Sequence, residues 1–208
     1  MGGVATRKGA RFKSGGTVNA LHRLKTLNKF PRLDMINKKG GALMDGLFTA
    51  ENTVLGIGNI ILSDEGFGVH VVEYLKKNFT FPENVQLIDG GTLGVELMHF
   101  ITGTQRLLII DSIDGGAEGG KIFHLRGDDI KKHFAQKISA HEVGIQDVLT
   151  MLELSGKKIP HVELIGAQPF SLEAGTELTP QMSKLVPLFA DKAIEILRRW
   201  GLKAMLMI

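Results

Sequence analysis

Three acidic side chains stand where apolar, strand-like segments of the sequence end. Glu65 follows "TVLGIG", Asp89 ends the apolar part of "VQLIDGG", and Asp111 ends the apolar part of "RLLIIDS". An ionised carboxylate at the end of a buried strand is costly unless it is paired or binds a cation. Asp111 is therefore the strongest candidate for a chemical role, although an aspartate ahead of Gly115 and Gly116 also suits a turn. The carboxyl ends of parallel strands lie at one edge of the sheet, so we expect the three acids to gather there. Ligands of such sheets bind at this edge.

His141, in "KISAHEVG", adds an imidazole ahead of a predicted helix. With Glu65 and Asp111 it makes a set of two carboxylates and one imidazole, which suits a divalent transition metal with open coordination positions. Imidazole favours nickel, zinc or iron over magnesium, and the chain has no cysteine that could supply a thiolate. Structural roles are the alternative, because an acid such as Glu65 stabilises a helix N-terminus and His141 could be an ordinary surface histidine.

The stretch "VLGIGNIILSDEGFGVH" begins like a nucleotide-binding turn and then departs from it. Gly56 and Gly58 have the spacing of such a turn, but Ile61 stands where its third glycine belongs. The acids of "SDEG" then bring negative charge to the place of a phosphate, and we expect Asp64 to be the N-cap of the following helix. The loop thus suits a cation. A dinucleotide-binding protein is the alternative, with Asp89 as the acid that would bind the ribose hydroxyls.

Strand and helix patterns alternate along the chain from residue 52 onward. This order predicts a three-layer α/β fold with a mostly parallel, twisted central sheet of about five strands and helices on both faces. Thr179 and Pro180 suit the start of the last helix, and Pro187 predicts either a kink or a later start. We expect strands at residues 53–58, 85–91, 106–112, 120–126 and 161–168, the fourth nearer a sheet edge, and helices at residues 66–79, 93–101, 143–154 and 180–200.

The charge distribution separates a basic leader from an acidic domain. Residues 1–44 contain ten of the 25 Lys and Arg side chains but one of the 22 acids, so the remainder carries a net charge of about −6. We expect residues 1–44 to be a disordered leader, or sequence upstream of the natural start, and residues 45–208 to be a single α/β domain. No apolar stretch approaches the ~20 residues that a membrane span requires.

The chain resembles the maturation endopeptidases of nickel–iron hydrogenases over about residues 53–200. Five separate stretches in the expected order carry the resemblance: "GIGNIILSDEGFGVHVVEYL", "LIDGGTLGVELM", "LLIIDSIDGG", "KISAHEVGIQDVL" and "IGAQPFSLEAGTELTP". The resemblance implies a mixed α/β fold with a largely parallel sheet. It also implies an endopeptidase that removes a short C-terminal extension from the hydrogenase large-subunit precursor once nickel has been inserted.

The resemblance assigns roles to the same two carboxylates and one imidazole that were grouped above from the residue types and their positions. The family's nickel-contacting glutamate, aspartate and histidine match Glu65, Asp111 and His141, and the precursor would supply the nickel. Asp89 matches a further acid near the site. The base of amide hydrolysis would be Asp111, Asp89 or a metal-bound water, and the choice among them stays open. Phe170 departs from the family pattern, because we expect glutamate after "QP" in many members.

We therefore predict a cytoplasmic, monomeric hydrolase whose partner is the [NiFe] hydrogenase large-subunit precursor, with neither nucleic acid nor membrane as a partner. A serine mechanism is not expected, because the sequence has no G-x-S-x-G motif. Two alternatives remain open from the sequence. One is a Rossmann-like protein that binds a nucleotide or dinucleotide, and the other is a nickel-binding maturation chaperone without peptidase activity.

Overall fold

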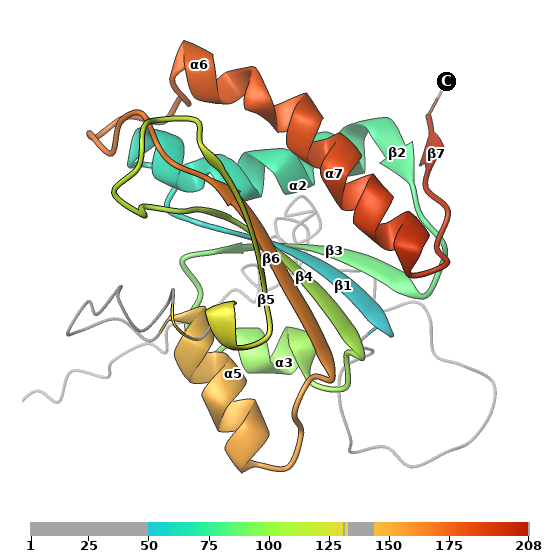
Figure 1. The fold of residues 1–208 in the computed structure, drawn as a ribbon. Helices are drawn as coiled ribbons and strands as arrows, with labels where there is room; N and C mark the ends of the chain where they lie inside the picture. The colour runs from blue at the N-terminus through green and yellow to red at the C-terminus, as the bar shows by residue number, and fades with distance from the viewer. Residues whose placement is uncertain (1–49, 131, 133–143, 208) are drawn as a thin grey trace, which may run out of the picture. The chain divides into compact units, whose positions relative to one another are not determined.

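The computed structural model describes residues 50–130, 132 and 144–207. Its central sheet consists of β1 (Asn52–Ile57), β3 (Val85–Gly91), β4 (Arg106–Ser112), β5 (Ile122–Arg126) and β6 (His161–Ala167). The strand order is β3-β1-β4-β6-β5, and all neighbours are parallel except β5 and β6, which are antiparallel (Figure 1). The five predicted strands and the mostly parallel sheet are thus confirmed, with β5 at an edge as expected.

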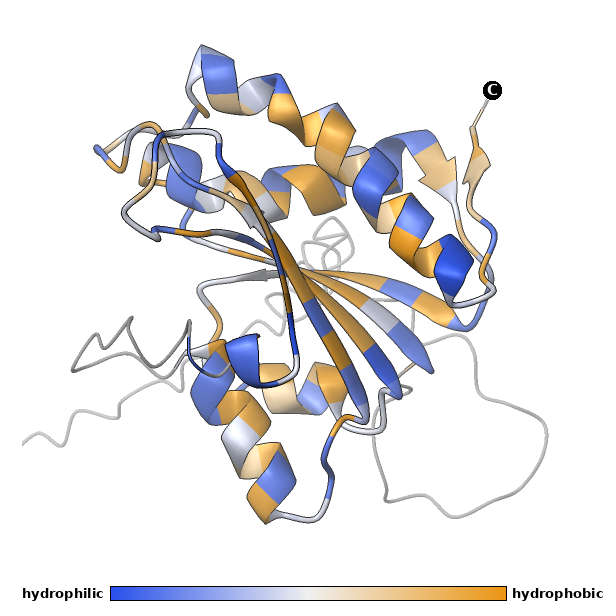
Figure 2. Cartoon of the chain, viewed as in Figure 1, coloured by the Kyte–Doolittle hydropathy of each residue, from blue (hydrophilic) through white to orange (hydrophobic). Residues whose placement is uncertain are grey.

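Helices cover both faces of the sheet, as predicted. One face is covered by α2 (Phe67–Asn78) and α7 (Leu185–Arg199), and the other by α3 (Leu97–Ile101) and α5 (Ile145–Leu154) (Figure 1). The apolar residues that dominate the central strands are visible in Figure 2.

The central strand β4 is buried on both sides, which explains its unbroken apolar sequence. Leu108 and Ile110 pack with α2 and α7, whereas Leu107 and Ile109 pack with α3 and α5. All four side chains are fully buried. Such a strand cannot alternate between polar and apolar residues, because neither of its faces meets water.

Helix α2 packs directly on the backbone of β1 and β4. A Cβ atom at Gly68 would collide with the carbonyl oxygens of Ile57 and Ile110, and a Cβ atom at Gly56 would collide with the carbonyl of Gly68. These two glycines therefore allow a helix–sheet approach that any larger residue would prevent. The approach fixes the start of α2 beside the carboxyl ends of β1 and β4.

The C-terminal helical region is divided rather than continuous. The short helix α6 (Pro180–Ser183) begins after Thr179, whose Oγ1 accepts a hydrogen bond from the backbone N–H of Met182 at 3.2 Å. Helix α7 begins at Leu185, so the later start predicted from Pro187 is correct.

Two details differ from the sequence prediction. Helix α3 begins at Leu97 rather than near residue 93. A second, two-stranded antiparallel sheet pairs β2 (Phe79–Thr80) with β7 (Met205–Leu206), and neither strand was predicted. Two-residue strands carry too little sequence pattern to be recognised, because at least four residues are needed to show alternation.

Among the described residues, no helix is both long enough and apolar enough to cross a membrane. Residues 1–44, for which a basic leader was predicted, and His141 lie outside the described residues.

Candidate active site

The candidate site lies where the strand order reverses. From β1 the chain proceeds to β3 on one side and then crosses to β4 on the other, so β1 and β4 flank the switch point at which ligands bind in such sheets. The short 3-10 helix η2 (Ser63–Gly66) carries Glu65, follows β1 and contacts β4. Asp111 is the next-to-last residue of β4. The fold thus brings Glu65 and Asp111 to the carboxyl ends of neighbouring strands.

Gly58 fixes the position of the loop that carries Glu65. Its φ angle is +130°, a backbone conformation that residues other than glycine rarely adopt. A Cβ atom at this position would also collide with the carbonyl oxygen of Glu65. Two backbone hydrogen bonds tighten the loop, from Leu62 N–H to the Asn59 carbonyl and from Glu65 N–H to the Leu62 carbonyl, both at 3.1 Å. The loop therefore turns back over Gly58 and holds Glu65 at the end of β1.

Asp111 and Asp89 occupy different environments. Asp111 is only 5% exposed, whereas Asp89 is an exposed residue of β3. Gly56 pairs with Asp89 on one side and with Ile110 on the other, so the width of two strand spacings, about 10 Å, separates β3 from β4. Because residues in register share a face, Asp89 points to the α2 and α7 side with Ile110. Asp111, one residue later, points to the side of α5, the helix that follows His141 in the sequence.

Asp64 does not cap a helix, which corrects the prediction made for it. Neither η2 nor α2 has a side-chain N-cap, and Asp64 is fully buried. Its Oδ2 accepts hydrogen bonds from the N–H groups of Phe170 (2.9 Å) and Ser171 (3.2 Å) and from the Thr179 hydroxyl (3.0 Å), while its Oδ1 accepts the Thr179 N–H (2.7 Å). Four hydrogen bonds to one carboxylate compensate for the cost of burying it.

The hydrogen bonds of Asp64 join two strand-end loops. The loop after β1 carries Glu65, and residues 168–179 follow β6, which is the strand next to β4. The two loops are also joined by their backbones, because Ser63 N–H donates to the Gly175 carbonyl at 2.8 Å. Asp64 is thus a structural residue that positions the neighbouring Glu65.

Gln168 organises the loop that follows Asp111. The side chain of Gln168 is 6% exposed, and its Oε1 accepts the N–H groups of Gly115 at 2.8 Å and Ala117 at 3.1 Å. Its Nε2 donates to Oδ1 of Asp114 at 2.9 Å. The sequence predicted a strand that ends at Gln168, one residue beyond the observed end of β6, but nothing in its local pattern revealed these contacts more than fifty residues away.

Phe170 has a packing role in this chain. Its ring lies against Gly119 and Gly120, where Cβ atoms would collide with the ring atoms. The side chain remains 43% exposed. An apolar, half-exposed ring therefore stands beside the site at the position where the resemblance led us to expect a glutamate.

Two carboxylates at one sheet edge can bind a cation or activate a water molecule. Among the described residues, no three His, Asp or Glu side chains are grouped closely enough to hold a metal ion. His141, the predicted third ligand, lies outside the described residues, so the predicted triad remains a prediction.

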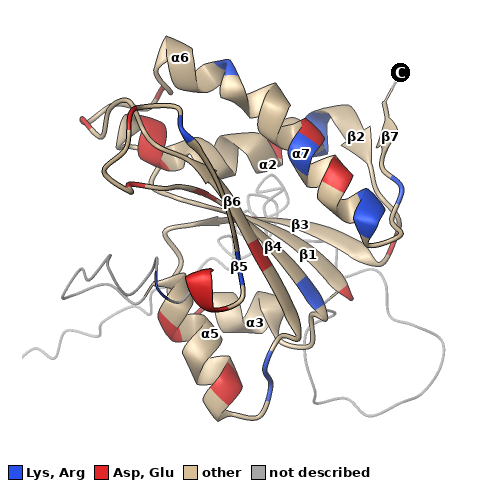
Figure 3. Cartoon of the chain, in the orientation of Figure 1, with Lys and Arg blue, Asp and Glu red and all other residues tan. Residues whose placement is uncertain are grey.

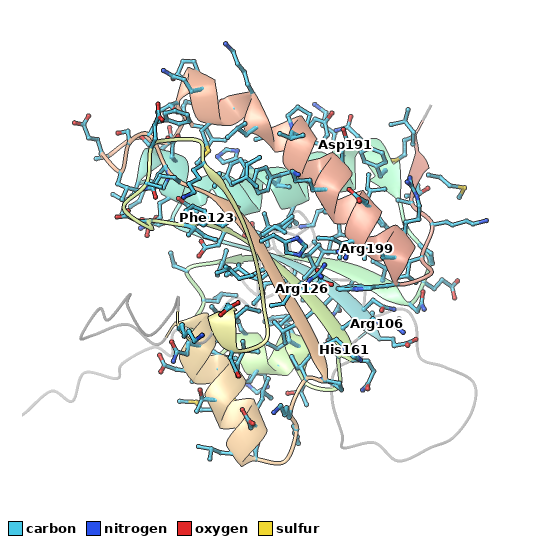
Figure 4. The ribbon with its side chains drawn as sticks, in the orientation of Figure 1. Arg106, Phe123, Arg126, His161, Asp191 and Arg199 are labelled. Atoms are coloured by element: carbon cyan, nitrogen blue, oxygen red, sulfur yellow. The ribbon has the colours of Figure 1, made fainter. Side chains whose placement is uncertain are left out.

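A second charged cluster lies at the opposite end of the strands and is already internally paired. Oε2 of Glu163 lies 2.7 Å from Nε2 of His124, 3.0 Å from Nε of Arg126 and 3.1 Å from Nη2 of Arg199. Figure 4 labels the two arginines of this cluster. Burial opposes the ionisation of Glu163, but the hydrogen bonds from His124 and Arg126 and the charges of Arg126 and Arg199 outweigh it and lower its pKa. A cavity of about 720 Å³ beside this cluster is lined by residues such as Arg106, the first residue of β4, far from Asp111 at the other end.

Comparisons with known proteins identify the family. A family model described as hydrogenase maturation protease matches residues 69–196. The hydrogenase expression/formation protein HupD of Bradyrhizobium diazoefficiens is 40% identical over 150 residues, which cover 71% of this chain and 78% of that protein.

Solved structures agree with these matches. The hydrogenase maturating endopeptidase HybD from E. coli has a TM-score of 0.71 and 34% identity, over 75% of this chain and 97% of the other. The [NiFe] hydrogenase maturation protease HycI from Thermococcus kodakarensis has a TM-score of 0.59 and 25% identity, over 72% and 93%.

These matches do not support the dinucleotide-binding alternative or the alternative of a chaperone without peptidase activity. The geometry of the loop after β1 also disfavours a dinucleotide. In a dinucleotide-binding turn the backbone at the second glycine approaches the pyrophosphate, but here the space beside Gly58 is occupied by the Glu65 carbonyl. The match to the family model covers more than half of the chain, and the predicted fold and enzyme class agree with it. The chain belongs to the hydrogenase maturation protease family and is a peptidase.

Proposed function

We propose that this chain is the endopeptidase that removes the C-terminal extension of a [NiFe] hydrogenase large-subunit precursor. The observation that carries the proposal is the pairing of family membership with the position of Glu65 and Asp111. Both acids stand at the carboxyl ends of neighbouring parallel strands, where ligands bind in this class of sheet.

In this proposal, Glu65, Asp111 and His141 complete the coordination of nickel that the precursor already holds. Two carboxylates and an imidazole suit a divalent transition metal, and none of them needs to retain the metal between turnovers. The burial of Asp111 supports this role, because a carboxylate that is 5% exposed gains more from a bound cation than an exposed one would. A precursor without nickel would lack this contact and would bind too weakly to be cut.

Hydrolysis of the peptide bond requires a base for water and stabilisation of the developing oxyanion. The nickel ion of the substrate can stabilise that charge as a Lewis acid. Asp111 is the stronger candidate for the base, because it lies at the switch point and points to the side of the helix that follows His141. Asp89 is exposed and points to the other face of the sheet, so its proposed part is contact with the substrate rather than proton transfer.

We place this reaction in the cytoplasm, because a checkpoint on nickel insertion must act where the precursor is assembled. We also propose that the chain acts as a monomer, since all the candidate residues belong to one chain. Size-exclusion chromatography with light scattering will test the second statement. A stable dimer that loses activity on dilution would contradict it.

The decisive experiment compares nickel-loaded and nickel-free precursor as substrates of the purified full chain. We expect the nickel-loaded precursor to lose its C-terminal extension, seen as a shift of one gel band and a new C-terminus by mass spectrometry. The nickel-free precursor should stay intact. Stable binding of nickel-loaded precursor without any cleavage would instead support the chaperone alternative.

A further inference from the structure

Four large apolar side chains are exposed on two loops beside the candidate active site. Ile60 and Ile61 lie on the loop after β1 and are 49% and 60% exposed. Phe170 and Leu172 lie on the loop after β6 and are 43% and 45% exposed. Scattered apolar residues on a surface need no explanation, but a group of four beside a functional site indicates a surface that binds a partner. We call these four residues the apolar rim.

The backbone beneath the apolar rim is held in place by hydrogen bonds. The buried carboxylate of Asp64 accepts the N–H of Phe170 at 2.9 Å. Ser63 N–H donates to the Gly175 carbonyl at 2.8 Å, and Gly175 N–H donates to the Ile61 carbonyl at 3.0 Å. A surface that is already ordered loses less conformational entropy on binding, so its apolar contacts contribute more of their energy to affinity.

The surroundings of the apolar rim are mainly acidic. Residues 113–121 and 168–179, the loops after β4 and β6, contain four acids and a single basic residue, Lys121. Figure 3 shows their acidic residues in red beside the start of α2. A partner that fits this surface therefore has apolar side chains together with positive charge, since acidic groups would be repelled. The exposed acids of the two loops are Asp114, Glu118, Glu173 and Glu177.

We propose that the apolar rim binds a segment of the hydrogenase precursor that combines apolar side chains with Lys or Arg. This inference rests on the proposed function and adds the surface by which the substrate is held beside the bond to be cut. Continuity with the site supports this occupant, because Ile61 and Glu65 share one loop and Phe170 is bound to the adjacent Asp64. The apolar rim thus determines affinity and specificity, while Glu65 and Asp111 act on the nickel.

Steady-state kinetics with nickel-loaded precursor test the proposal. The double variant Ile61→Ser/Leu172→Ser should raise KM at least about tenfold and leave kcat nearly unchanged, because central apolar contacts of an interface dominate its affinity. Leu154→Ser is the matched control, since Leu154 is 83% exposed at the end of α5 and should show wild-type kinetics. An unchanged KM in the double variant, with an unchanged melting temperature, would overturn the proposal.

Photocrosslinking separates this proposal from the proposed function. With p-benzoylphenylalanine in place of Ile61, we expect a crosslink to one precursor segment that contains apolar and basic residues, and none from the same probe at Leu154. A precursor that is cut but gives no crosslink at Ile61 would refute the docking surface and leave the peptidase function intact. A crosslink without cleavage would refute the peptidase function and leave the docking surface intact.

The charge component has its own test. The triple variant Glu118→Gln/Glu173→Gln/Glu177→Gln should raise KM and reduce its dependence on salt, because exposed charges are screened beyond about 10 Å at 0.1 M salt. Glu195→Gln, at an exposed acid of α7, is the control and should change neither. A KM that rises equally for both variants would contradict the assigned charge complementarity. Crosslinks from the Ile61 position to residues 1–44 or to a second copy of the chain, in place of the precursor, would contradict the proposal that the apolar rim binds the precursor.

Discussion

Replacement of the buried Asp64 by asparagine should destabilise the domain although the two side chains have nearly the same shape. Oδ2 of Asp64 accepts three hydrogen bonds and Oδ1 accepts one. Asparagine offers one oxygen and one NH₂ group. In its best orientation the oxygen replaces Oδ2, and the NH₂ group then faces the Thr179 N–H, which is also a donor. One hydrogen bond is lost, a buried donor is left unpaired, and the three remaining bonds lose their charge assistance.

The expected loss of unfolding free energy is about 1–3 kcal/mol for Asp64→Asn, the range for one unpaired buried group. Asp64→Ala should cost about 3–5 kcal/mol, because all the donors then lose their partner. For a domain of this size each kcal/mol corresponds to a fall in melting temperature of about 2–4 °C. Because Glu65 is the next residue, we also expect kcat for precursor cleavage to fall in both variants.

Urea denaturation followed by circular dichroism measures the free energies directly. Asp191→Asn, at an exposed acid of α7, is the matched control and should lie within about 0.5 kcal/mol of wild type. If Asp64→Asn is as stable as this control, the four hydrogen bonds do not contribute to the fold, and the positioning role of Asp64 is wrong.

Two further predictions concern Gly58 and Glu163. Gly58→Ala should cost at least about 1 kcal/mol more in unfolding free energy than Gly103→Ala and should displace Glu65. Both glycines have positive φ, but only at Gly58 does a Cβ atom meet backbone, so equal losses in urea denaturation would refute the contact. Glu163→Gln should lower the free energy of unfolding at pH 7 by about 0.5–1.5 kcal/mol, because it removes the charge that pairs with His124, Arg126 and Arg199. The loss is modest because the cluster is partly exposed to solvent. The lowered pKa of Glu163 means that its contribution is present above its ordinary value of 4.5 and is lost as the pH falls through the folded value. The stability difference between wild type and variant should therefore shrink in acid, and a difference that grows there would contradict the assigned ion pairs.

The architecture was predictable because its strands and helices are encoded locally. The unbroken apolar run of β4 indicated a strand covered on both faces, and the alternation in β5 indicated an edge strand. The positions of Glu65 and Asp111 at one edge followed from the rule that parallel strands present their carboxyl ends together. Motif resemblance added the function, which the family comparisons then bore out.

The features of the site that the sequence did not reveal are contacts between residues that the local pattern does not connect. Asp64 had the local pattern of a helix cap, but its actual partners lie 106 to 115 residues later. Gly58 was expected to allow a tight turn, and the structure adds a second reason, the close approach of the Glu65 carbonyl. The sequence could not reveal either, because local propensity contains no information about which distant segment packs on a loop.

Single-turnover cleavage of nickel-loaded precursor tests the central claim most directly, namely that Glu65, Asp111 and His141 act on one ion. Rates of extension release should fall at least about 100-fold in Glu65→Gln, Asp111→Asn and His141→Ala, the range for loss of a group that acts in the transition state. Asp191→Asn should release the extension at the wild-type rate. An Asp111→Asn variant that cleaves the precursor as fast as wild type would contradict the account.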